Sequence, residues 1–423
     1  MSGNHALIFG ASGISGWAIT NALISGYPSP DSFTHITALT DRPLAPEAAQ
    51  WPESHKVQVV SGLDLLSNQG QSGLEEDMKS KIKRIGTVTH VFFFAYLFNA
   101  DPAQEIAVNV ELLKRAVTAT GNLSKNLRFV VLPTGTKAYG VHLLDGFPFP
   151  HDRPLTESLP RIPEPYASQN FYYAQTDFLS SLSASKSWSW CEVRPDVVVG
   201  FVPNNNVYCL AQTLATYLSL YVNIEGKGAT CAFPGTERSW EILSNDSSQD
   251  IVAKFSIYAS LHPEDCGGGQ AFNVADNSTP SSWSVKWPII CDFFGLHGTP
   301  PPMGGSGPQP GQYLEEHFGE WRALEKERGL QTGRVGNERS LGGFQYFIMT
   351  MFDFDRDLDM KKMHKAWGNH VEETDEGENY TLKHGLYPGG IMLPRVIGSK
   401  EELGAAARNG TRSFKPSMHT AKV

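Results

Sequence analysis

The chain has 423 residues, of which 40% are hydrophobic and 19% charged, a composition that excludes a disordered or collagen-like polypeptide. Its 35 Lys and Arg residues against 44 Asp and Glu give a formal charge of -9, which argues against general binding to the phosphate backbone of nucleic acids. No apolar run approaches the roughly 20 residues of a membrane helix, and the N-terminus lacks the pattern of a secretory signal. We therefore expect a cytoplasmic protein with no membrane or nucleic-acid partner.

The five cysteines form no Cys-x-x-Cys pair and have no zinc-ligand spacing. They are Cys191, Cys209, Cys231, Cys266 and Cys291. An odd, dispersed set is typical of free thiols in a reducing compartment, and we expect no metal site. The run 353–357 (Asp-Phe-Asp-Arg-Asp) resembles half of a calcium loop, but it lacks the glycine and the final glutamate and is interpreted as a polar helix face.

The first 200 residues alternate short apolar runs with amphipathic stretches. The apolar runs predict buried strands at 5–9, 35–39, 57–60, 91–95, 129–132 and 192–199. Helical spacing predicts helices at 17–24, 106–118 and 171–183. Continuous apolar strands separated by helices indicate an α/β fold, in which a doubly wound parallel sheet is covered on both faces.

Beyond about residue 200 the pattern loosens. Helices are predicted at 210–221, 251–260 and 313–326, a short strand at 271–274, and one or two helices over 344–365. The stretch 298–311 is rich in proline and glycine and is expected to be a surface loop. We expect a nucleotide-binding domain at 1–205 whose sheet is completed by segments near 230–275. A smaller, mainly helical region at 206–397 and a disordered tail at 398–423 would follow.

A glycine-rich loop follows the first predicted strand and precedes the first helix. Its sequence is Gly10-Ala-Ser12-Gly13-Ile14-Ser-Gly16. Gly10 would make the tight turn, Gly13 would let the backbone approach a pyrophosphate, and Gly16 would let helix and strand pack closely. The free amides at the helix N-terminus favour the same anion. The loop therefore predicts a dinucleotide site.

Charged residues follow the second and third strands. Asp41, in the position where an acid usually accepts the 2′-hydroxyl of NAD, would repel a 2′-phosphate. Arg42 beside it could stack on adenine or pair with that phosphate. The charge of Asp41 disfavours a 2′-phosphate and the charge of Arg42 can favour one, so the choice between NADH and NADPH stays open. Asp64 suits a hydrogen bond to the adenine amino group, or it is an ordinary turn acid.

The Tyr-x-x-x-Lys pair of short-chain dehydrogenases is absent, because Thr176 and Asp177 stand four residues after Tyr172 and Tyr173. A lysine is available elsewhere: the fifth strand ends in a Thr-Gly turn that carries Lys137. Ligands bind at the carboxyl ends of parallel strands. We therefore expect Lys137 and Tyr172 to meet over one crevice.

These motifs resemble those of the progesterone 5β-reductase and iridoid synthase-like group of atypical extended short-chain dehydrogenases/reductases. The resemblance spans about residues 5–335, with weaker similarity to about 370. The segments that carry it are the glycine loop at 10–16, Thr-His-Val-Phe at 89–92, Thr-Gly-Thr-Lys at 134–137, Asn-Phe-Tyr-Tyr at 170–173 with Asp177, Arg-Pro at 194–195 with Gly200, and Ala-Phe-Asn-Val at 271–274. The lysine turn together with Asn-Phe-Tyr-Tyr is specific, whereas the glycine loop alone is not.

The resemblance implies a Rossmann domain with a smaller helical substrate-binding region. It also implies reduction of the activated carbon–carbon double bond of an α,β-unsaturated carbonyl, usually with NADPH. Tyr172 and Lys137 would be the catalytic groups, since a phenol beside an ammonium stabilises an enolate oxygen and the ammonium lowers the pKa of the phenol. Further cofactor contacts are expected from Leu65, Ala95, Tyr96, Thr134, Pro195 and Val198.

The sequence departs from the group at several points. An arginine usually stands where Asp41 is, which puts the NADPH preference in doubt and makes NADH a second cofactor. A phenylalanine often stands six residues after the lysine, where this chain has Leu143. We expect Leu143 and Tyr139 to contact substrate, and the 298–311 stretch to reshape their pocket.

Two other functions fit the same residues. A carbonyl reductase or alcohol dehydrogenase would use the same phenol and amine, because ketone reduction also produces an oxyanion. A non-catalytic nucleotide sensor would bind the cofactor and a protein partner without turnover. The expected ligand is a small enone, enal or ketone, and a homodimer is one arrangement we consider.

Overall fold

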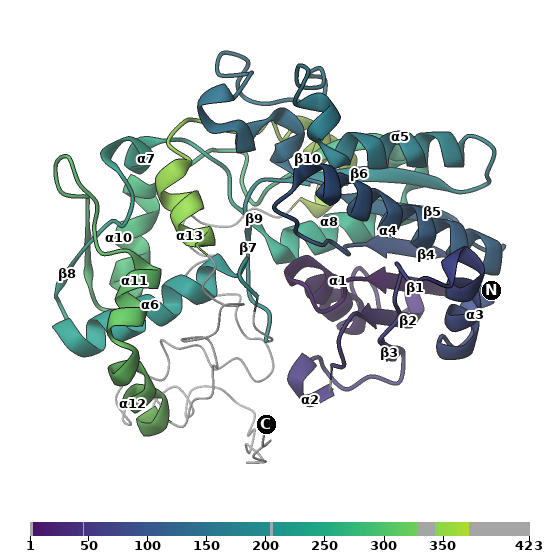
Figure 1. The fold of residues 1–423 in the computed structure, drawn as a ribbon, viewed down its shortest axis with the longest axis horizontal. Helices are drawn as coiled ribbons and strands as arrows, with labels where there is room; N and C mark the ends of the chain where they lie inside the picture. The colour runs from purple at the N-terminus through teal and green to yellow at the C-terminus, as the bar shows by residue number, and fades with distance from the viewer. Residues whose placement is uncertain (1–2, 45, 204–205, 329–342, 372–423) are drawn as a thin grey trace.

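A computed structural model of the chain describes residues 3–44, 46–203, 206–328 and 343–371. Its centre is a seven-stranded sheet with the order β10-β6-β5-β4-β1-β2-β3, in which all neighbouring strands are parallel (Figure 1). This order confirms the predicted α/β Rossmann fold. The strands are β1 (Asn4–Phe9), β2 (Phe33–Thr40), β3 (Val57–Ser61), β4 (His90–Phe93), β5 (Phe129–Pro133), β6 (Ser189–Pro195) and β10 (Gln270–Val274).

The strands β1, β4 and β5 are buried on both faces, which explains their continuous apolar sequences. In β1, Ala6 and Ile8 point into one hydrophobic core, while Leu7 and Phe9 point into a second core across the sheet. This alternation follows from the two-residue period of a strand. The two cores hold helices on opposite faces of the sheet, which is the doubly wound arrangement.

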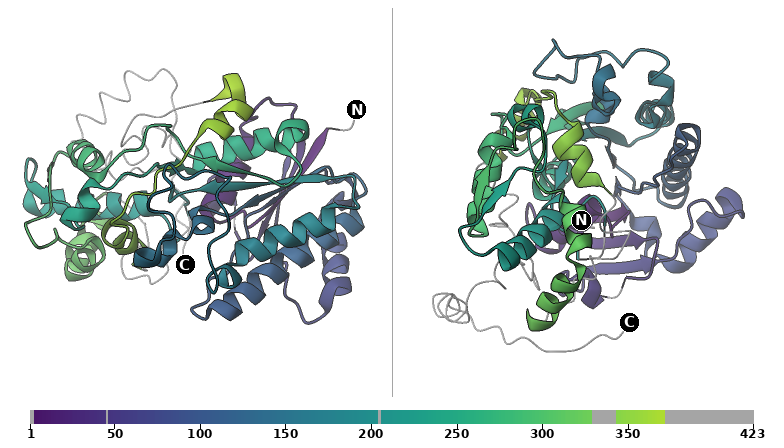
Figure 2. Two further views of the ribbon diagram at one scale, coloured as in Figure 1. Left: turned by 90° about the horizontal axis from the view of Figure 1, so that it is seen from above. Right: turned by 60° about the vertical axis from the view of Figure 1, so that its left-hand side comes forward.

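Helices cover the two faces in separate layers, as the view along the sheet in Figure 2 shows. α1 (Ile14–Ile24) and α8 (Gln249–Leu261) pack on one face, and α3 (Gly70–Lys81), α4 (Pro102–Leu123) and α5 (Phe171–Ser183) pack on the other. α4 begins four residues earlier than its apolar spacing predicts, because Asp101 accepts a hydrogen bond from the Ala103 amide and Pro102 occupies the first turn.

The strand predicted at 192–199 is two strands. β6 ends at Pro195, and β7 (Val198–Val199) pairs instead with β9 (Ser247–Ser248) in a separate two-stranded sheet. Another small sheet pairs β8 (Thr230–Ala232) with β11 (His297–Thr299). Of the strands within 230–275, β10 joins the central sheet, whereas β8 and β9 lie in the small sheets. Residues 298–299 of the predicted loop lie in β11.

The chain after β7 builds a mainly helical region beside the sheet, on the left of Figure 1. Its longest helix, α6 (Leu210–Glu225), is buried on nearly every side and packs against α11. The other helices after β7 are α7 (Glu237–Glu241), α9 (Pro263–Cys266), α10 (Trp283–Phe293), α11 (Pro310–Glu316), α12 (Phe318–Arg328), α13 (Phe344–Tyr346), the π-helix η5 (Phe347–Met351) and α14 (Lys361–Trp367). Of these, α9 packs against α8 and β6, and α14 packs against α8 and β10, so both belong to the sheet side of the molecule. Short elements in the half that carries the first six strands of the central sheet are α2 (Pro46–Ala49), η1 (Ile85–Thr87), η2 (Thr136–Tyr139), η3 (Val141–Gly146) and η4 (Ala167–Gln169).

Residues 353–357 form an irregular segment, so the predicted polar helix face is wrong. Arg356 from this segment is buried and forms an ion pair of 2.9 Å with Asp196. Asp355 and Asp357 pair with Arg153 at 3.0 and 2.7 Å. These acids therefore have arginine partners. The tail predicted at 398–423 lies outside the described residues.

Within the described ranges, no helix is long and apolar enough to cross a membrane. The same part of the chain holds no group of three or more His, Cys, Asp or Glu side chains that could bind a metal ion. All five cysteines are free and buried.

A buried carboxyl group near the end of β10 gives the fold a pH dependence. Asp276 is 2% exposed, and its two oxygens accept hydrogen bonds from the amide and the hydroxyl of Ser248. Burial raises the pKa of Asp276 to about 7, against the opposing effect of the two Ser248 hydrogen bonds. Since the folded-state pKa is raised, this group's contribution to stability is complete at acidic pH and is lost as the pH rises to 7.

We predict that the free energy of unfolding of the wild type falls between pH 5 and pH 7.5, by up to about 3 kcal/mol from this group. Asp276→Asn should remove most of that slope, because an amide keeps the shape of the carboxyl without its charge. Urea unfolding at several pH values measures the effect. Asp77→Asn, on the exposed side of α3, serves as the control and should keep the wild-type slope. Equal slopes in the wild type and Asp276→Asn would contradict the prediction.

Candidate active site

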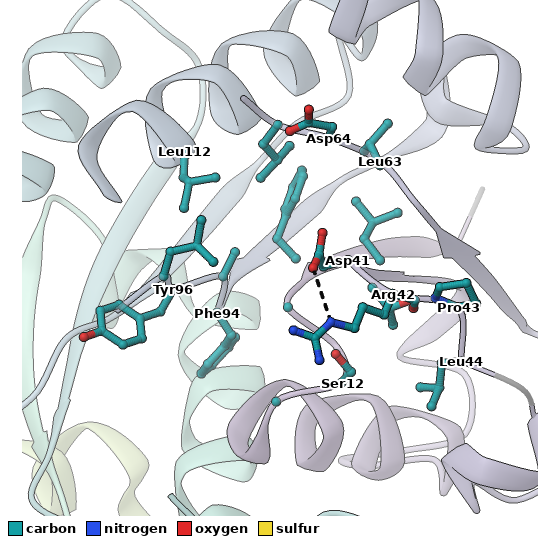
Figure 3. A pocket seen from close by; sticks show the side chains of 18 of the residues that line it. Ser12, Asp41, Arg42, Pro43, Leu44, Leu63, Asp64, Phe94, Tyr96 and Leu112 are labelled. Carbon is teal, nitrogen blue, oxygen red and sulfur yellow. Dashed lines mark hydrogen bonds and ion pairs between the residues drawn. The ribbon is translucent and has the colours of Figure 1, made fainter. Parts of the chain in front are cut away.

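A cavity of about 630 Å³ opens at the carboxyl ends of β1, β2 and β4. Figure 3 shows its lining, with the loop after β1 on one side and the turn after β3 on the other. The predicted cofactor residues that line it are Gly10, Ser12, Gly13, Asp41, Arg42, Asp64, Leu65, Ala95 and Tyr96. The remaining predicted cofactor residues, Ile14, Gly16, Thr134, Pro195 and Val198, are not among its lining residues.

The glycine loop has the close approaches that its sequence predicts. Gly10 has a φ of +79°, and a Cβ there would lie 2.6 Å from the backbone of Phe94. A Cβ on Gly16 would lie 2.2 Å from the Gly10 carbonyl oxygen, so only glycine lets α1 start this close to β1. Gly13 is the N-cap of α1 and lines the cavity. The free amides of α1 therefore meet a cavity that fits a phosphate-bearing ligand.

The two charged residues after β2 stand at the cavity mouth. The Arg42 Nε lies 4.0 Å from the Asp41 Oδ2, and the two side chains are 66% and 85% exposed (Figure 3). Such an exposed pair is weak, so either side chain is available to a ligand. The Asp64 Oδ1 accepts the Leu66 amide at 2.8 Å, so Asp64 is a turn acid that also lines the cavity.

The structure brings the Lys137 turn against the start of α5, where Tyr172 lies. Asn170 joins the two segments: its Nδ2 donates to the Lys137 carbonyl at 2.9 Å, and its Oδ1 accepts the Tyr172 amide at 3.1 Å as the N-cap of α5. The Tyr172 hydroxyl lies 3.7 Å from the position that a Cβ would take on Gly135, two residues before Lys137. Asn170 is 2% exposed, so this junction is rigidly packed.

The ammonium of Lys137 pairs with a carboxylate that the sequence did not single out. Its Nζ donates to the Glu105 Oε2 at 3.1 Å and lies 5.0 Å from the centroid of the Phe171 ring. The Tyr96 hydroxyl donates to the other oxygen of Glu105 at 2.5 Å. Since Tyr96 also lines the cavity, this chain of contacts links the cavity to the Lys137 turn.

The electrostatic environment of Tyr172 differs from the expectation. Burial raises the pKa of the Tyr172 phenol well above its usual value, and the charges of Glu105 and Glu192 raise it further. The predicted lowering of this pKa by the lysine is therefore wrong. Among the described residues, the Tyr172 hydroxyl has no hydrogen-bond partner. Tyr172 is thus a neutral phenol whose hydroxyl is available to a ligand.

A polar network under the turn includes two of the predicted ligand contacts. Glu192 accepts from the Thr134 hydroxyl at 2.6 Å and from two nitrogens of Arg194, each at 2.9 Å. Tyr139 donates to the Asn273 Oδ1 at 2.7 Å and is 1% exposed. The geometry therefore gives Tyr139 a structural position in the core and does not support its contact with substrate.

The remaining predicted residues surround this region at different depths. Leu143 is half-buried in η3 and packs on the core beside the lysine turn. Ile14 is the first residue of α1, and Pro195 is the last residue of β6. Val198 of β7 pairs with Ser247 of β9. The carbonyl oxygen of Pro195 lies 3.2 Å from the Cβ position on Gly135.

Sequence reasoning missed Glu105 because it placed the helix start at residue 106. The Asp101-Pro102 signal, if used, would have put Glu105 in the first turn of α4, on the same face as the buried Asn109. An acid on a buried helix face needs a partner, and that would have been the clue to an ion pair. Its partner, Lys137, could not be identified without the fold.

Comparisons with known proteins show the family to which the chain belongs. The sequence profile of the family described as "PRISE-like Rossmann-fold domain" matches residues 6–386. The chain is 40% identical over 303 residues to the "Short chain dehydrogenase ausT" of Aspergillus calidoustus, a match that covers 70% of this chain and 73% of that protein. It is 29% identical to the "3-oxo-Delta(4,5)-steroid 5-beta-reductase" of Arabidopsis thaliana over 69% of each chain.

A solved structure that superposes on this chain also supports the fold. The Bordetella bronchiseptica enzyme WbmG, solved in complex with NAD and UDP, superposes with a TM-score of 0.52 over 94% of this chain and 98% of its own. The two sequences are 13% identical, so the comparison bears on the fold alone.

We predict that Gly16→Ala costs about 1–3 kcal/mol of unfolding free energy, because the added methyl group overlaps the Gly10 carbonyl oxygen. Gly121→Ala is the matched control. It lies within α4 with no atom within 4 Å of the added Cβ, and it should stabilise the protein by about 0.5–1 kcal/mol. Urea unfolding measures both variants. A Gly16→Ala variant as stable as the wild type would show that α1 and β1 are not in close contact.

Proposed function

The chain belongs to the PRISE-like Rossmann-fold family and is an oxidoreductase of the short-chain dehydrogenase/reductase type, and from this we propose that it reduces the activated carbon–carbon double bond of an α,β-unsaturated carbonyl compound with a nicotinamide cofactor. The observation that supports the proposal most directly is the junction made by Asn170, which holds the Lys137 turn against the start of α5. The named reductase among its relatives acts, by its name, on a 3-oxo-Δ4,5-steroid, which is an enone.

The residues suit the electronic demands of that reaction. A reduced nicotinamide, when bound, supplies a hydride equivalent. As the β-carbon of the enone gains that hydride, negative charge develops on the carbonyl oxygen. The neutral Tyr172 phenol can donate a hydrogen bond to this oxygen. Lys137, on the turn that Asn170 joins to the start of α5, would add positive charge to the site. Fixed donors of this kind stabilise the charge without reorganisation.

The position of the cavity supports a dinucleotide site, because it opens beside the glycine loop that the sequence singles out. The loop at 10–16 would hold the pyrophosphate, and the residues after β2 and β3 would hold the adenosine end. We infer that NADPH is the cofactor and that NADH is also used, because Arg42 lines the cavity and is not neutralised by a strong ion pair, while Asp41 beside it opposes a 2′-phosphate.

Tyr172→Phe and Lys137→Ala should each lower the rate of enone-dependent NAD(P)H oxidation about 100-fold, since losing one oxyanion donor costs about 3 kcal/mol of transition-state stabilisation. Absorbance at the nicotinamide band gives the rate, and product analysis separates a saturated ketone from an allylic alcohol. An allylic alcohol would identify a carbonyl reductase instead. Wild-type rates in both variants would end the assignment of these two residues.

The charged pair after β2 gives a prediction on cofactor choice. Arg42→Ala should lower kcat/KM for NADPH at least tenfold, about the value of one charge-assisted hydrogen bond, and change kcat/KM for NADH little. Asp41→Asn should shift the NADPH to NADH ratio in the opposite direction, towards NADPH. Steady-state rates with each cofactor measure the ratio. If Arg42→Ala leaves the ratio unchanged, Arg42 does not contact the 2′-phosphate.

A further inference from the structure

The Lys137–Tyr172 region contains a buried carboxylate for which the proposed reaction has no evident use. Glu105 is 7% exposed, and it lies in the first turn of α4. Both of its oxygens are occupied, one by the Lys137 ammonium at 3.1 Å and the other by the Tyr96 hydroxyl at 2.5 Å. Burying a carboxylate costs free energy unless the carboxylate is paired. The two contacts therefore explain how the fold tolerates Glu105, but they do not explain what Glu105 does.

Charged and titratable groups approach Tyr172 from several elements. Glu105 comes from α4, Glu192 from β6, and the phenols Tyr96 and Tyr208 from loops. Lys137 of η2 faces Glu105. Glu192 has its own counter-charge, because Arg194 donates to both of its oxygens. Glu105 differs from Glu192 in that its counter-charge is the ammonium that the reaction would use. The charge of Glu105 therefore acts directly on the Lys137 ammonium.

We propose that Glu105 is a positioning residue of the reductase site, whose carboxylate holds the Lys137 ammonium on the α4 side and so sets the charge that an oxyanion bound in the site would meet. This inference rests on the proposed function. A neutral phenol donates a hydrogen bond to a carbonyl oxygen. Burial is the main cause of the raised pKa that keeps Tyr172 neutral, and the charge of Glu105 adds to it.

The test uses 4-nitrophenol as a stable mimic of an enolate, because it is planar, ionises near neutral pH and changes its absorbance on ionisation. The ligand is titrated between pH 5 and 9 in the presence of full-length protein and oxidised cofactor. Glu105→Gln keeps the shape of the side chain and removes its charge. We expect the pKa of bound 4-nitrophenol to fall by about one pH unit, so that the phenolate binds about tenfold more tightly.

Two variants control for charge and for position. Glu111→Gln removes a negative charge from the same helix, where Glu111 pairs with Arg115 at 2.7 Å, and it should leave the ionisation of the bound ligand unchanged. Lys137→Met removes the positive partner and should shift the pKa of the bound ligand upwards. Glu105→Ser, a second neutral replacement, answers the same question where the glutamine variant does not fold.

The possible results separate the two proposals. If Tyr172→Phe weakens binding of 4-nitrophenol but Glu105→Gln leaves its ionisation at the wild-type value, the role of Glu105 is refuted and the reductase proposal stands. If neither Tyr172→Phe nor Lys137→Met changes the binding or the ionisation of 4-nitrophenol, the proposed active site is wrong. The proposed role of Glu105 is then refuted as well. A shift in Glu111→Gln equal to that in Glu105→Gln would mean that only the net charge of the protein matters.

Discussion

The parallel direction of all seven central strands is the constraint on which the site depends. It brings every carboxyl end to one edge of the sheet, so residues far apart in the chain meet there. The glycine loop follows β1, the Asp41–Arg42 pair follows β2, and the Lys137 turn follows β5. An antiparallel partner within this set would carry its turn to the opposite edge and separate the cavity from the lysine.

Asn170 and Glu105 turn this common edge into a specific arrangement. Asn170 caps α5 and also holds the backbone of the lysine turn, so one side chain joins the start of the helix to that turn. Glu105 then directs the lysine side chain, and Tyr96 connects that carboxylate to the lining of the cavity. Asn170 thus holds the backbone of the lysine turn, and Glu105 sets the direction in which the Lys137 ammonium points. The position of the ammonium therefore depends on three elements.

Local sequence patterns predicted those parts of the structure that local forces decide. The apolar runs gave the central strands, and the loop at 10–16 gave the close approach of Gly16 to Gly10. The prediction failed where a tertiary contact overrides a local pattern. The apolar run through Val199 reads as one strand, but Pro195 has no amide hydrogen to continue the ladder, and Val198 finds a new partner in Ser247. The partner of Lys137 could not be predicted, because no local pattern encodes an ion pair between positions 105 and 137.

The segment after residue 350 also supports the lysine turn, although its sequence suggests only a polar surface. Asp196 accepts from the Thr136 hydroxyl at 2.9 Å through one oxygen and from Arg356 at 2.9 Å through the other. Thr136 immediately precedes Lys137. A buried aspartate with one partner missing would be strongly destabilising, so the lysine turn requires Arg356 to be in place. The two predicted domains therefore share a buried ion pair, Asp196–Arg356, beside the turn that carries Lys137.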